Sequence, residues 1–502
     1  MLFNSIDFLI FFPLVLLIYF VVPSRIRYIW LLAASYFFYM CWNPVYVILL
    51  LISTLITYCC GYIIDKIREN PQFAPASKKR LMLLSLTCSF LANLGILLFF
   101  KYANFLTDSV NHILYMININ PLPKFDIILP VGISFYTFQA LGYTIDVYRG
   151  TVKAEKNPLK YALFVSFFPQ LVAGPIERSK SLLKQIHEEP EHKLWDYQRV
   201  TYGFTMMLWG FFMKVVIADR VAVLVDTVFN NYETHGTVEL IIGALAFAIQ
   251  IYCDFAGYST IAIGAAKALG FELMDNFDTP YFAMGIADFW RRWHISLSTW
   301  FRDYLYIPLG GNRCGKLKHY RNILITFCVS GLWHGAAWTY VVWGLLHGIY
   351  QIVEKELTRL VKRVNARLHT KTESFGYRFF TIIITFIFVD MAWIVFRADS
   401  LYQAFHYIQR MFLFPDWWTL FDMSIYGLGL DILEMNILMI GLSLLLLVGV
   451  LQYKKKETLA AFLQRQWIVF RWGFLLFLLI FCVFFGYYGP GFDSNQFIYF
   501  QF

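Results

Sequence analysis

Charged side chains are scarce in this chain of 502 residues. Asp, Glu, Lys and Arg make up only 15% of it, against about 25% in soluble globular proteins. Hydrophobic residues account for 59% and aromatic residues for 20%. Apolar side chains in such excess need a lipid environment, because too little polar surface is left to cover them in water. The composition therefore predicts a polytopic membrane protein.

Several catalytic and structural signatures are also missing. The eight cysteines contain no CxxC pair, so neither a zinc site nor a disulfide framework is predicted. No GxSxG nucleophile elbow and no HExxH helix occurs, so neither a serine hydrolase nor a metalloprotease is indicated. No internal repeat is visible, which weakens a secondary-transporter interpretation. We expect no metal ion and no permanently bound cofactor.

The excess of basic residues has a membrane explanation. The net charge of +9 comes from lysines and arginines gathered in a few loops, as the positive-inside rule expects. Nucleic-acid binding is therefore not expected. The N-terminal stretch Met1–Asp7 has no basic segment, and no small-residue cleavage site follows it, so a cleavable signal peptide is not expected either. The prediction is a multi-pass protein of the cell membrane, in contact with the lipid bilayer.

The apolar segments predict an all-α polytopic membrane protein with one membrane-embedded domain over residues 1–502. With about 20 apolar residues per span, roughly eleven to thirteen segments qualify, some of them short or re-entrant. We expect an external loop at 101–126 and a re-entrant element at 161–173. Asp254 should face protein or water, because a carboxylate in lipid costs several kcal/mol. The expected spans are 6–22, a shorter run ending at Trp42, 45–64, 81–100, 127–147, 201–219, 237–270, 379–397, 436–452 and 473–488.

One stretch, residues 285–348, carries two histidines on aromatic segments. Around the first of them, helical spacing predicts two faces between 287 and 304. That segment is too charged to cross lipid, since each charge costs about 2.5–3.5 kcal/mol at mid-membrane. It should therefore line a wet cavity. One predicted face has Trp290, Trp293, Leu297 and Trp300, and the other has Arg291, His294, Ser298 and Arg302.

His334, the second histidine, is surrounded by small residues. Gly331, Gly335 and two alanines leave little bulk around it, which predicts an imidazole that a substrate can approach closely. A single membrane histidine is more often a hydrogen-bonding residue between helices, and His347 is interpreted in that way. A near-neutral base beside guanidinium groups nevertheless suits acyl transfer, because the imidazole can deprotonate a hydroxyl while arginine binds phosphate.

Four blocks of this sequence together resemble the membrane-bound O-acyltransferase family. They are the tryptophan- and arginine-rich block at 290–304, Gly331-Leu332-Trp333-His334-Gly335, Gln170-Leu171-Val172-Ala173-Gly174-Pro175-Ile176 and Tyr252-Cys253-Asp254-Phe255-Ala256-Gly257-Tyr258. They lie in the family's order within a core of about 130–350. The similarity is to the bacterial branch that acylates cell-envelope polymers such as alginate and teichoic acid. It implies a ring of helices around a central funnel, with the active-site histidines deep inside.

The resemblance also implies residue roles. His334 would be the catalytic residue and His294 its partner. The residues expected to bind the donor or line the cavity are Arg291, Arg292, Ser298, Arg302, Asp303 and Trp333.

By the same resemblance, the chain should transfer an acyl group from a cytoplasmic thioester towards an extracytoplasmic polysaccharide. The donor would be acetyl-CoA or an acyl-carrier thioester, and an SGNH-like transferase outside the membrane would be the partner. The length favours acetyl transfer, so O-acetylation in a bacterial plasma membrane is the leading hypothesis. D-alanyl transfer to teichoic acid is the alternative within the family. A polysaccharide or lipid transporter is the alternative outside it.

The aromatic tail, residues 490–502, supplies one further candidate. It follows the last span and a Gly-Pro-Gly hinge, and it ends in Phe497-Ile498-Tyr499-Phe500-Gln501-Phe502. Tyr499 is a candidate acyl relay, because phenoxide, with a pKa of about 10, leaves an ester more easily than an alkoxide does. The resemblance implies the same role, since related envelope systems have a similar tail. The alternative is an aromatic residue that anchors the tail at the membrane interface.

Replacing Tyr499 with phenylalanine separates these two roles. Tyr499→Phe keeps the ring and removes the hydroxyl, so a relay predicts that polymer acylation stops. Mass spectrometry of the wild-type C-terminal peptide should then show the acyl group on Tyr499, most clearly when the downstream transferase is absent. Normal acylation by the variant would show that Tyr499 only packs at the interface.

Overall fold

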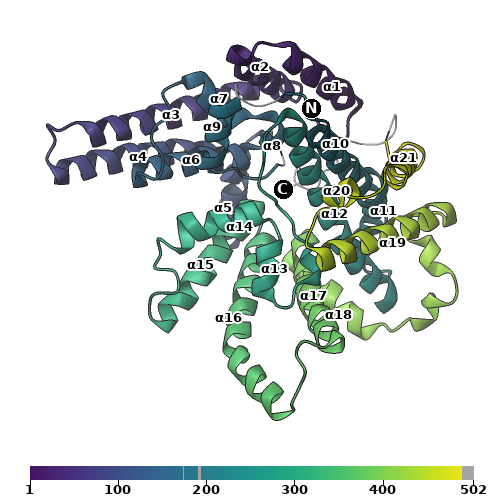
Figure 1. Ribbon diagram of the computed structural model, residues 1–502. Coiled ribbons are helices and arrows are strands. Elements are labelled where there is room, and N and C mark those ends of the chain that lie inside the picture. The colour runs from purple at the N-terminus through teal and green to yellow at the C-terminus, as the bar shows by residue number, and fades with distance from the viewer. Residues whose placement is uncertain (173, 190–193, 489–502) are drawn as a thin grey trace. The chain divides into compact units, whose positions relative to one another are not determined.

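The computed structural model describes residues 1–172, 174–189 and 194–488, and the secondary structure of these residues is helical throughout (Figure 1). The chain divides into two units. The first comprises Met1–Met207 with Ile261–Met274, and the second comprises Leu208–Thr260 with Asp275–Phe502. The helices α10 (Tyr197–Phe211) and α12 (Thr237–Leu269) contribute residues to both units. The predicted all-α class is confirmed.

The first unit contains the N-terminal helices. Two of them begin at a side chain that accepts a backbone hydrogen bond, Asn157 and Ser5, and Ser5 accepts from the amide of Phe8 at 3.2 Å. Such caps satisfy amides that have no partner within the helix. The helices are α1 (Ile6–Val21), α2 (Arg27–Met40), α3 (Val47–Glu69), α4 (Pro75–Leu97), α5 (Ala103–Met116), α6 (Ile133–Arg149), α7 (Pro158–Ser166), α8 (Phe168–Leu171) and α9 (Ser179–Glu188).

The expected external loop at 101–126 is half helical. A π-helical turn at Leu98–Tyr102 joins α4 to α5, so helix continues from Pro75 to Met116. Two asparagines of α5, Asn104 and Asn111, hold the returning chain. The side-chain amide of Asn104 donates to the carbonyl of Phe125 at 3.0 Å, and that of Asn111 donates to Leu122 at 3.0 Å. The prediction was wrong because polar residues on one face of a helix can resemble loop residues.

Within the segment 161–173, which was predicted to be re-entrant, the structure has most of α7 and all of α8. The break falls at Phe167, and the side chains on both sides of it are buried. The amide of Phe168 donates to the Ser35 hydroxyl at 3.1 Å, and the Gln170 side chain donates to the carbonyl of Phe164 at 2.7 Å. Polar side chains thus satisfy the backbone groups that a break exposes, as burial requires.

The second unit contains the helices that follow α10. A π-helical segment at Phe212–Ala218 leads into α11, and a second one, Arg302–Tyr306, follows α14. The helices are α11 (Asp219–Asn230), α12, α13 (Ile286–Arg292), α14 (Ile295–Phe301), α15 (Lys316–His334), α16 (Trp338–Arg367), α17 (Phe375–Arg397), α18 (Leu401–Leu413), α19 (Ile432–Lys455), α20 (Leu459–Gln464) and α21 (Ile468–Phe485).

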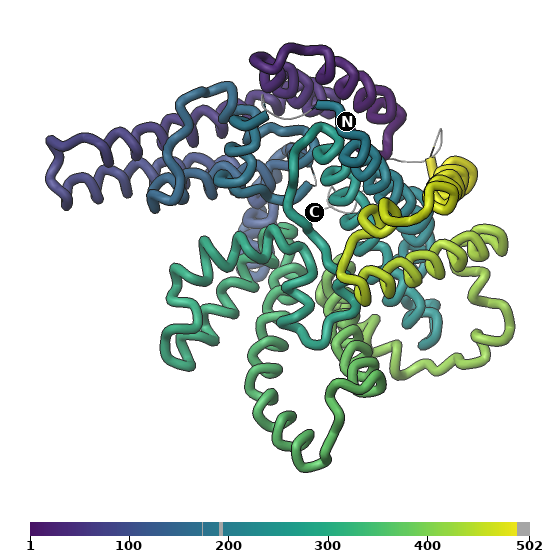
Figure 2. Tube along the Cα trace, viewed as in Figure 1, coloured from purple at the N-terminus to yellow at the C-terminus, as the bar shows by residue number. Residues whose placement is uncertain are grey.

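Helices α15 and α16 form a tight hairpin joined at residues 335–337 (Figure 2). Glycines make their close approach possible. A Cβ added at Gly331 would lie 2.2 Å from the carbonyl oxygen of Tyr340, and one at Gly344 would lie 2.2 Å from that of Phe327. Small residues allow this kind of backbone contact between membrane helices. The residues that we expected to leave His334 open to substrate are therefore packing residues of the hairpin.

A buried ion trio ties α12 to the π-helical segment before α11. The Lys214 ammonium lies 2.7 Å from a carboxylate oxygen of Asp219 and 2.6 Å from one of Asp254. All three side chains are at most 2% exposed, and the ammonium also lies 5.5 Å from the ring centre of Tyr258. Asp254 faces protein, as predicted, and its lysine partner was not foreseen.

Among the described residues, 6 helical segments are long and apolar enough to cross a membrane. The sequence-based count of roughly eleven to thirteen segments is larger because it also included short and re-entrant segments. Several of these, such as α7 with α8 and α10, are short or interrupted helices. Thr237–Leu269 is 72% buried over its most apolar window, whereas Ile468–Phe485 is 17% buried. The first is thus an internal helix, and the second presents its apolar surface outwards. The segments that qualify are Pro44–Glu69, Pro75–Met116, Thr237–Leu269, Phe375–Arg397, Ile432–Lys455 and Ile468–Phe485.

Candidate active site

His294 lies at a break between two short helices of the second unit. Helix α13 ends just before it and α14 begins just after it, and each has 7 residues. His294 itself is left-handed, with φ 42° and ψ 56°, a conformation that costs a non-glycine residue about 1–3 kcal/mol. The single helix predicted over 287–304 is therefore wrong. Because the chain turns here, the imidazole is fully buried while Arg291 and Arg302 stay exposed.

Asn276 holds this break through its backbone and its side chain. Its main-chain carbonyl accepts from the amide of Ile295 at 3.0 Å. Its side-chain oxygen lies 3.0 Å from Nδ1 of His294 and accepts from the Ser296 hydroxyl at 2.9 Å. Its amide nitrogen donates to the Ser259 hydroxyl at 3.0 Å, which fixes the orientation of the amide. A carbonyl oxygen only accepts, so Nδ1 of His294 is the donor and Nε2 is the basic nitrogen of the neutral ring.

His334 ends α15 and is enclosed by aromatic rings. It is 3% exposed, and its ring meets those of Trp333, Trp343 and Phe396 edge to face, with centroids 5.0, 5.1 and 5.7 Å away. His347 packs against Trp343, with ring centroids 5.1 Å apart, and accepts a hydrogen bond from the indole of Trp290 at 3.3 Å. His347 is a buried packing histidine, as predicted. It belongs to α16, however, and not to a helix continuous with His334.

The two histidines of the leading hypothesis meet in the structure. The ring centroids of His294 and His334 are 6.4 Å apart. Trp333 contacts both imidazoles, with its ring centre 5.8 Å from that of His294 and 5.0 Å from that of His334. Phe255 packs edge to face on His294 at 4.6 Å. Both imidazoles therefore lie close enough to contact one small acyl group inside an aromatic enclosure.

The surroundings of His294 favour its neutral form. The residue lies between α13 and α14, which are too short to span a membrane. Burial lowers the pKa of His294 well below its ordinary value, and the neighbouring charge of His334 lowers it further. His294 is therefore neutral at neutral pH, with one ring nitrogen unprotonated.

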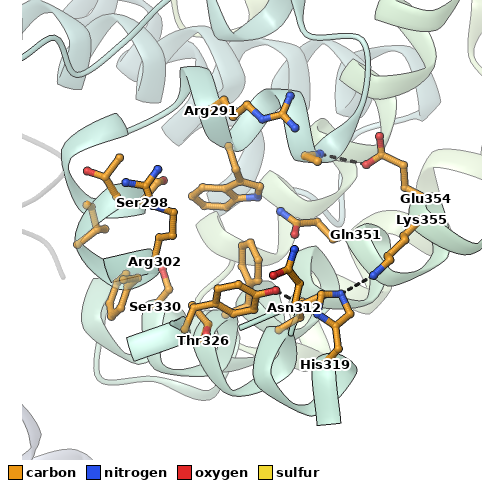
Figure 3. A pocket seen from close by; sticks show the side chains of 18 of the residues that line it. Arg291, Ser298, Arg302, Asn312, His319, Thr326, Ser330, Gln351, Glu354 and Lys355 are labelled. Carbon is orange, nitrogen blue, oxygen red and sulfur yellow. Dashed lines mark hydrogen bonds between the residues drawn. The ribbon is translucent and has the colours of Figure 1, made fainter. Parts of the chain in front are cut away.

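A cavity of about 710 Å³ lies near the histidine pair, although neither imidazole lines it, and Figure 3 shows the side chains around it. Ile295, the neighbour of His294, and Ser330, one helical turn before His334, belong to its wall. Three cations line it, namely Arg291, Arg302 and Lys355, against the single carboxylate of Glu354. The other lining residues are Ala287, Trp290, Leu297, Ser298, Thr299, Phe301, Tyr306, Asn312, His319, Ile323, Thr326, Phe327, Gln351 and Thr358.

The cations of the cavity differ in their partners. Lys355 lies 2.8 Å from Nε2 of His319, whose Nδ1 lies 3.0 Å from the Tyr306 hydroxyl. Arg302 pairs with Asp303 at 2.8 Å. Arg291 makes no ion pair with any residue that the structure describes. A basic, half-polar chamber of this size suits an anionic, phosphate-bearing ligand.

The sequence-predicted site residues that the structure describes separate into three groups. Arg291, Ser298 and Arg302 line the cavity together, with Asp303 paired to Arg302. Arg292 lies outside the lining and binds Asp288 at 3.0 Å. His294, Trp333 and His334 form the buried cluster. Tyr499 lies outside the described residues. No group of three metal-binding side chains occurs in the described part of the chain.

Sequence reasoning missed Asn276, His319 and Lys355. Asn276 stands in a short polar stretch after α12, where nothing distinguishes it from a loop asparagine. His319 and Lys355 belong to segments that read as solvated basic surface. The sequence did contain one signal: His319 and Lys355 lie at similar distances before and after the short break at 335–337, so a helical hairpin there would bring them together.

A helical membrane protein with a buried histidine pair beside a basic cavity has the features of a membrane-embedded acyltransferase. The profile of the membrane-bound O-acyltransferase family matches residues 153–396. The probable alginate O-acetylase AlgI of Azotobacter vinelandii is 40% identical over 425 residues, covering 84% of this chain and 80% of that protein. The chain belongs to the membrane-bound O-acyltransferase family and is an O-acyltransferase.

Two further relatives show the range of similarity. The peptidoglycan O-acetyltransferase of Helicobacter pylori is 36% identical over 407 residues, which cover 76% of this chain and 73% of that protein. The teichoic acid D-alanyltransferase of Bacillus subtilis is 30% identical over 306 residues, which cover 57% of this chain and 72% of that protein. Family membership confirms the resemblance and favours an enzyme over a transporter.

The Asn276 contact predicts a shift in the pH dependence of activity. Asn276→Asp places a carboxylate beside His294, which stabilises the imidazolium and raises the pKa of His294. Less of His294, the proposed partner of the catalytic His334, is then neutral at a given acidic pH, so the acidic limb of the pH–rate profile should move to higher pH. Asn231→Asp, the same change at the exposed end of α11, is the control. A uniform loss of activity without a shift of the limb would mean that Asn276 only supports the fold.

Proposed function

We propose that this chain O-acetylates an extracytoplasmic polysaccharide, with an acetyl thioester on the cytoplasmic side of a bacterial plasma membrane as the donor. The observation that carries the proposal is the buried His294–His334 pair beside a cavity with three cations. Two relatives of high coverage are an alginate O-acetylase and a peptidoglycan O-acetyltransferase, and both names describe O-acetylation of a polysaccharide.

The cavity suits the donor. Acetyl-CoA and carrier-bound pantetheine both present phosphate, which the guanidinium groups of Arg291 and Arg302 can bind through planar hydrogen bonds. The pantetheine arm would extend past Ser298 and Ser330, so that the thioester lies near the two imidazoles. This arrangement gives Lys355 a role as a third phosphate-binding cation.

The transfer step requires a base and a buried reaction centre. The oxygen of an acceptor hydroxyl attacks the thioester carbonyl, a C–O bond forms, and the C–S bond breaks. The hydroxyl proton passes to an imidazole and then to the departing thiolate, so the products are an acetyl ester and a thiol. We assign His334 as the catalytic residue and His294 as its partner in this transfer. The acceptor hydroxyl is that of Tyr499 or of a carrier to the exterior.

Sequence identity and coverage support acetyl transfer over D-alanyl transfer. Identity is 40% and coverage 84% of this chain for an alginate O-acetylase, against 30% and 57% for a D-alanyltransferase. We also propose that an SGNH-like transferase outside the membrane completes delivery to the polymer. We further propose the ring of helices around a central funnel that the family resemblance implied.

Removing the His334 imidazole tests the proposal directly. His334→Ala should lower ester-linked acetate on the polymer by about 10²- to 10⁴-fold, the usual contribution of general acid–base catalysis. Acetate is measured on isolated cell-envelope glycans at equal membrane protein level. His112→Ala, the same change at an exposed residue of α5, should have no effect. Wild-type acetate in the His334 variant would rule out the catalytic role.

Occupation of the cavity by the donor can be measured by cysteine protection. The thiol introduced by Ser298→Cys should react with a small water-soluble maleimide and be protected by acetyl-CoA. The native Cys253 thiol, which is fully buried, serves as the internal unreactive control in the same peptide map. Equal labelling of the Ser298→Cys variant with and without donor would contradict donor binding in this cavity.

A further inference from the structure

A second cavity of about 720 Å³ lies in the second unit, away from the histidine pair. Its walls come from the facing sides of α12, α17 and α19, with the short turn Pro280–Phe282 as its floor. Most of the lining is aliphatic or aromatic. The apolar residues are Trp209, Ile249, Tyr252, Pro280, Tyr281, Phe282, Phe375, Phe379, Ile382, Leu442, Leu445, Leu446, Gly449 and Val450.

Apart from Thr279, the polar residues of this cavity lie at or next to the ends of two spanning helices. Arg378 stands in the first turn of α17, and Lys454 stands in the last turn of α19. Both line the cavity, together with Glu373 and Gln452. Because α17 begins where α19 ends, the two cations belong to the same end of the helix pair. Lys455 and Lys456 follow directly and are exposed, so this end is strongly basic.

An apolar cleft between spanning helices with basic residues at one end is complementary to a particular kind of molecule. A hydrocarbon chain fits the leucine- and phenylalanine-lined part, and a negative head group fits the basic end. A zwitterionic head group would gain little there, since its ammonium would meet Arg378 and Lys454. Charge complementarity therefore selects an anionic lipid.

We propose that this cavity is a binding site for an anionic membrane phospholipid. One acyl chain lies between α17 and α19, and the phosphate lies between the guanidinium of Arg378 and the ammonium of Lys454. Arg378 currently pairs with Glu373, an exposed carboxylate that competes with the phosphate for the same guanidinium. The proposal does not depend on the acyl group or the polymer that the enzyme uses.

Two aromatic residues that line this cavity, Tyr252 and Tyr281, also pack against residues of the active-site segment. The ring of Tyr281 lies 6.0 Å from that of Trp293, the residue just before His294, and 6.4 Å from that of Phe289 in α13. The Tyr252 ring lies 6.3 Å from the same Trp293. A lipid in this cleft therefore packs against Tyr252 and Tyr281, which in turn contact Trp293 next to the helix break at His294. It supports this aromatic layer without touching either imidazole.

The test compares two lipids on the purified full-length chain in detergent. Phosphatidylglycerol should remain bound in native mass spectrometry and raise the Tm in proportion to its concentration, whereas phosphatidylcholine of the same chain length should do neither. The double variant Arg378→Gln, Lys454→Gln should weaken phosphatidylglycerol binding by about fivefold for each cation lost. Lys362→Gln, an exposed residue of α16 outside the cavity, should leave it unchanged.

Two more variants probe the competing carboxylate and the chain-binding part. Glu373→Gln should strengthen phosphatidylglycerol binding, because it frees Arg378 and removes a negative charge. A Cβ at Gly449 would lie 3.3 Å from the Phe282 ring, so Gly449→Leu should fill the cleft and weaken binding while lipid-free Tm is retained. Equal binding of the two lipids to the wild type, or unchanged phosphatidylglycerol binding in the double variant, would overturn the proposal.

Discussion

The structure of the candidate site depends on the hydrogen bond between His294 and Asn276. A chain that leaves a helix at a left-handed histidine exposes backbone amides and strains one residue, and each unsatisfied buried group costs about 1–3 kcal/mol. Asn276 offsets these costs together, because it accepts from Ile295, Ser296 and His294 at one place. The amide that stabilises the break also decides which imidazole nitrogen is basic. Fold and chemistry are thus fixed by one side chain.

Around that contact, aromatic rings provide a rigid and weakly polar enclosure. Trp343 stacks on Trp393 with centroids 5.5 Å apart, and Trp393 packs on Trp293 at 5.0 Å. Rings of this size lose little conformational entropy relative to the surface that they bury. They also exclude water, so charge that develops on an imidazole is felt more strongly than it would be in solvent. The basic cavity on one side and the apolar cleft on the other therefore border the same aromatic layer.

The amino-acid sequence predicted the helical class, most of the apolar helices, the pairing of His294 with His334 in one cluster, and the cavity position of Arg291 and Arg302. These features follow from hydropathy and from helical spacing, which are local. It could not predict the break at His294, because the partner that stabilises it, Asn276, belongs to another segment. It misjudged residues 101–126 for the same reason, since Asn104 and Asn111 bind a returning chain that only the fold brings near. The burial of His334 was also missed, because the small residues around it serve the α15–α16 contact.

The buried trio of Lys214, Asp219 and Asp254 has a consequence for how this sequence can change over time. Removing the lysine alone would leave two carboxylates facing each other without water, and removing one partner of a buried pair typically costs about 3–5 kcal/mol. That loss is a large part of the roughly 5–15 kcal/mol by which a folded domain is stable. A single replacement that removes one of these charges is therefore expected to lower the folding stability strongly. The three residues are therefore energetically coupled, and replacing all of them together with apolar side chains would cost less than removing the lysine alone.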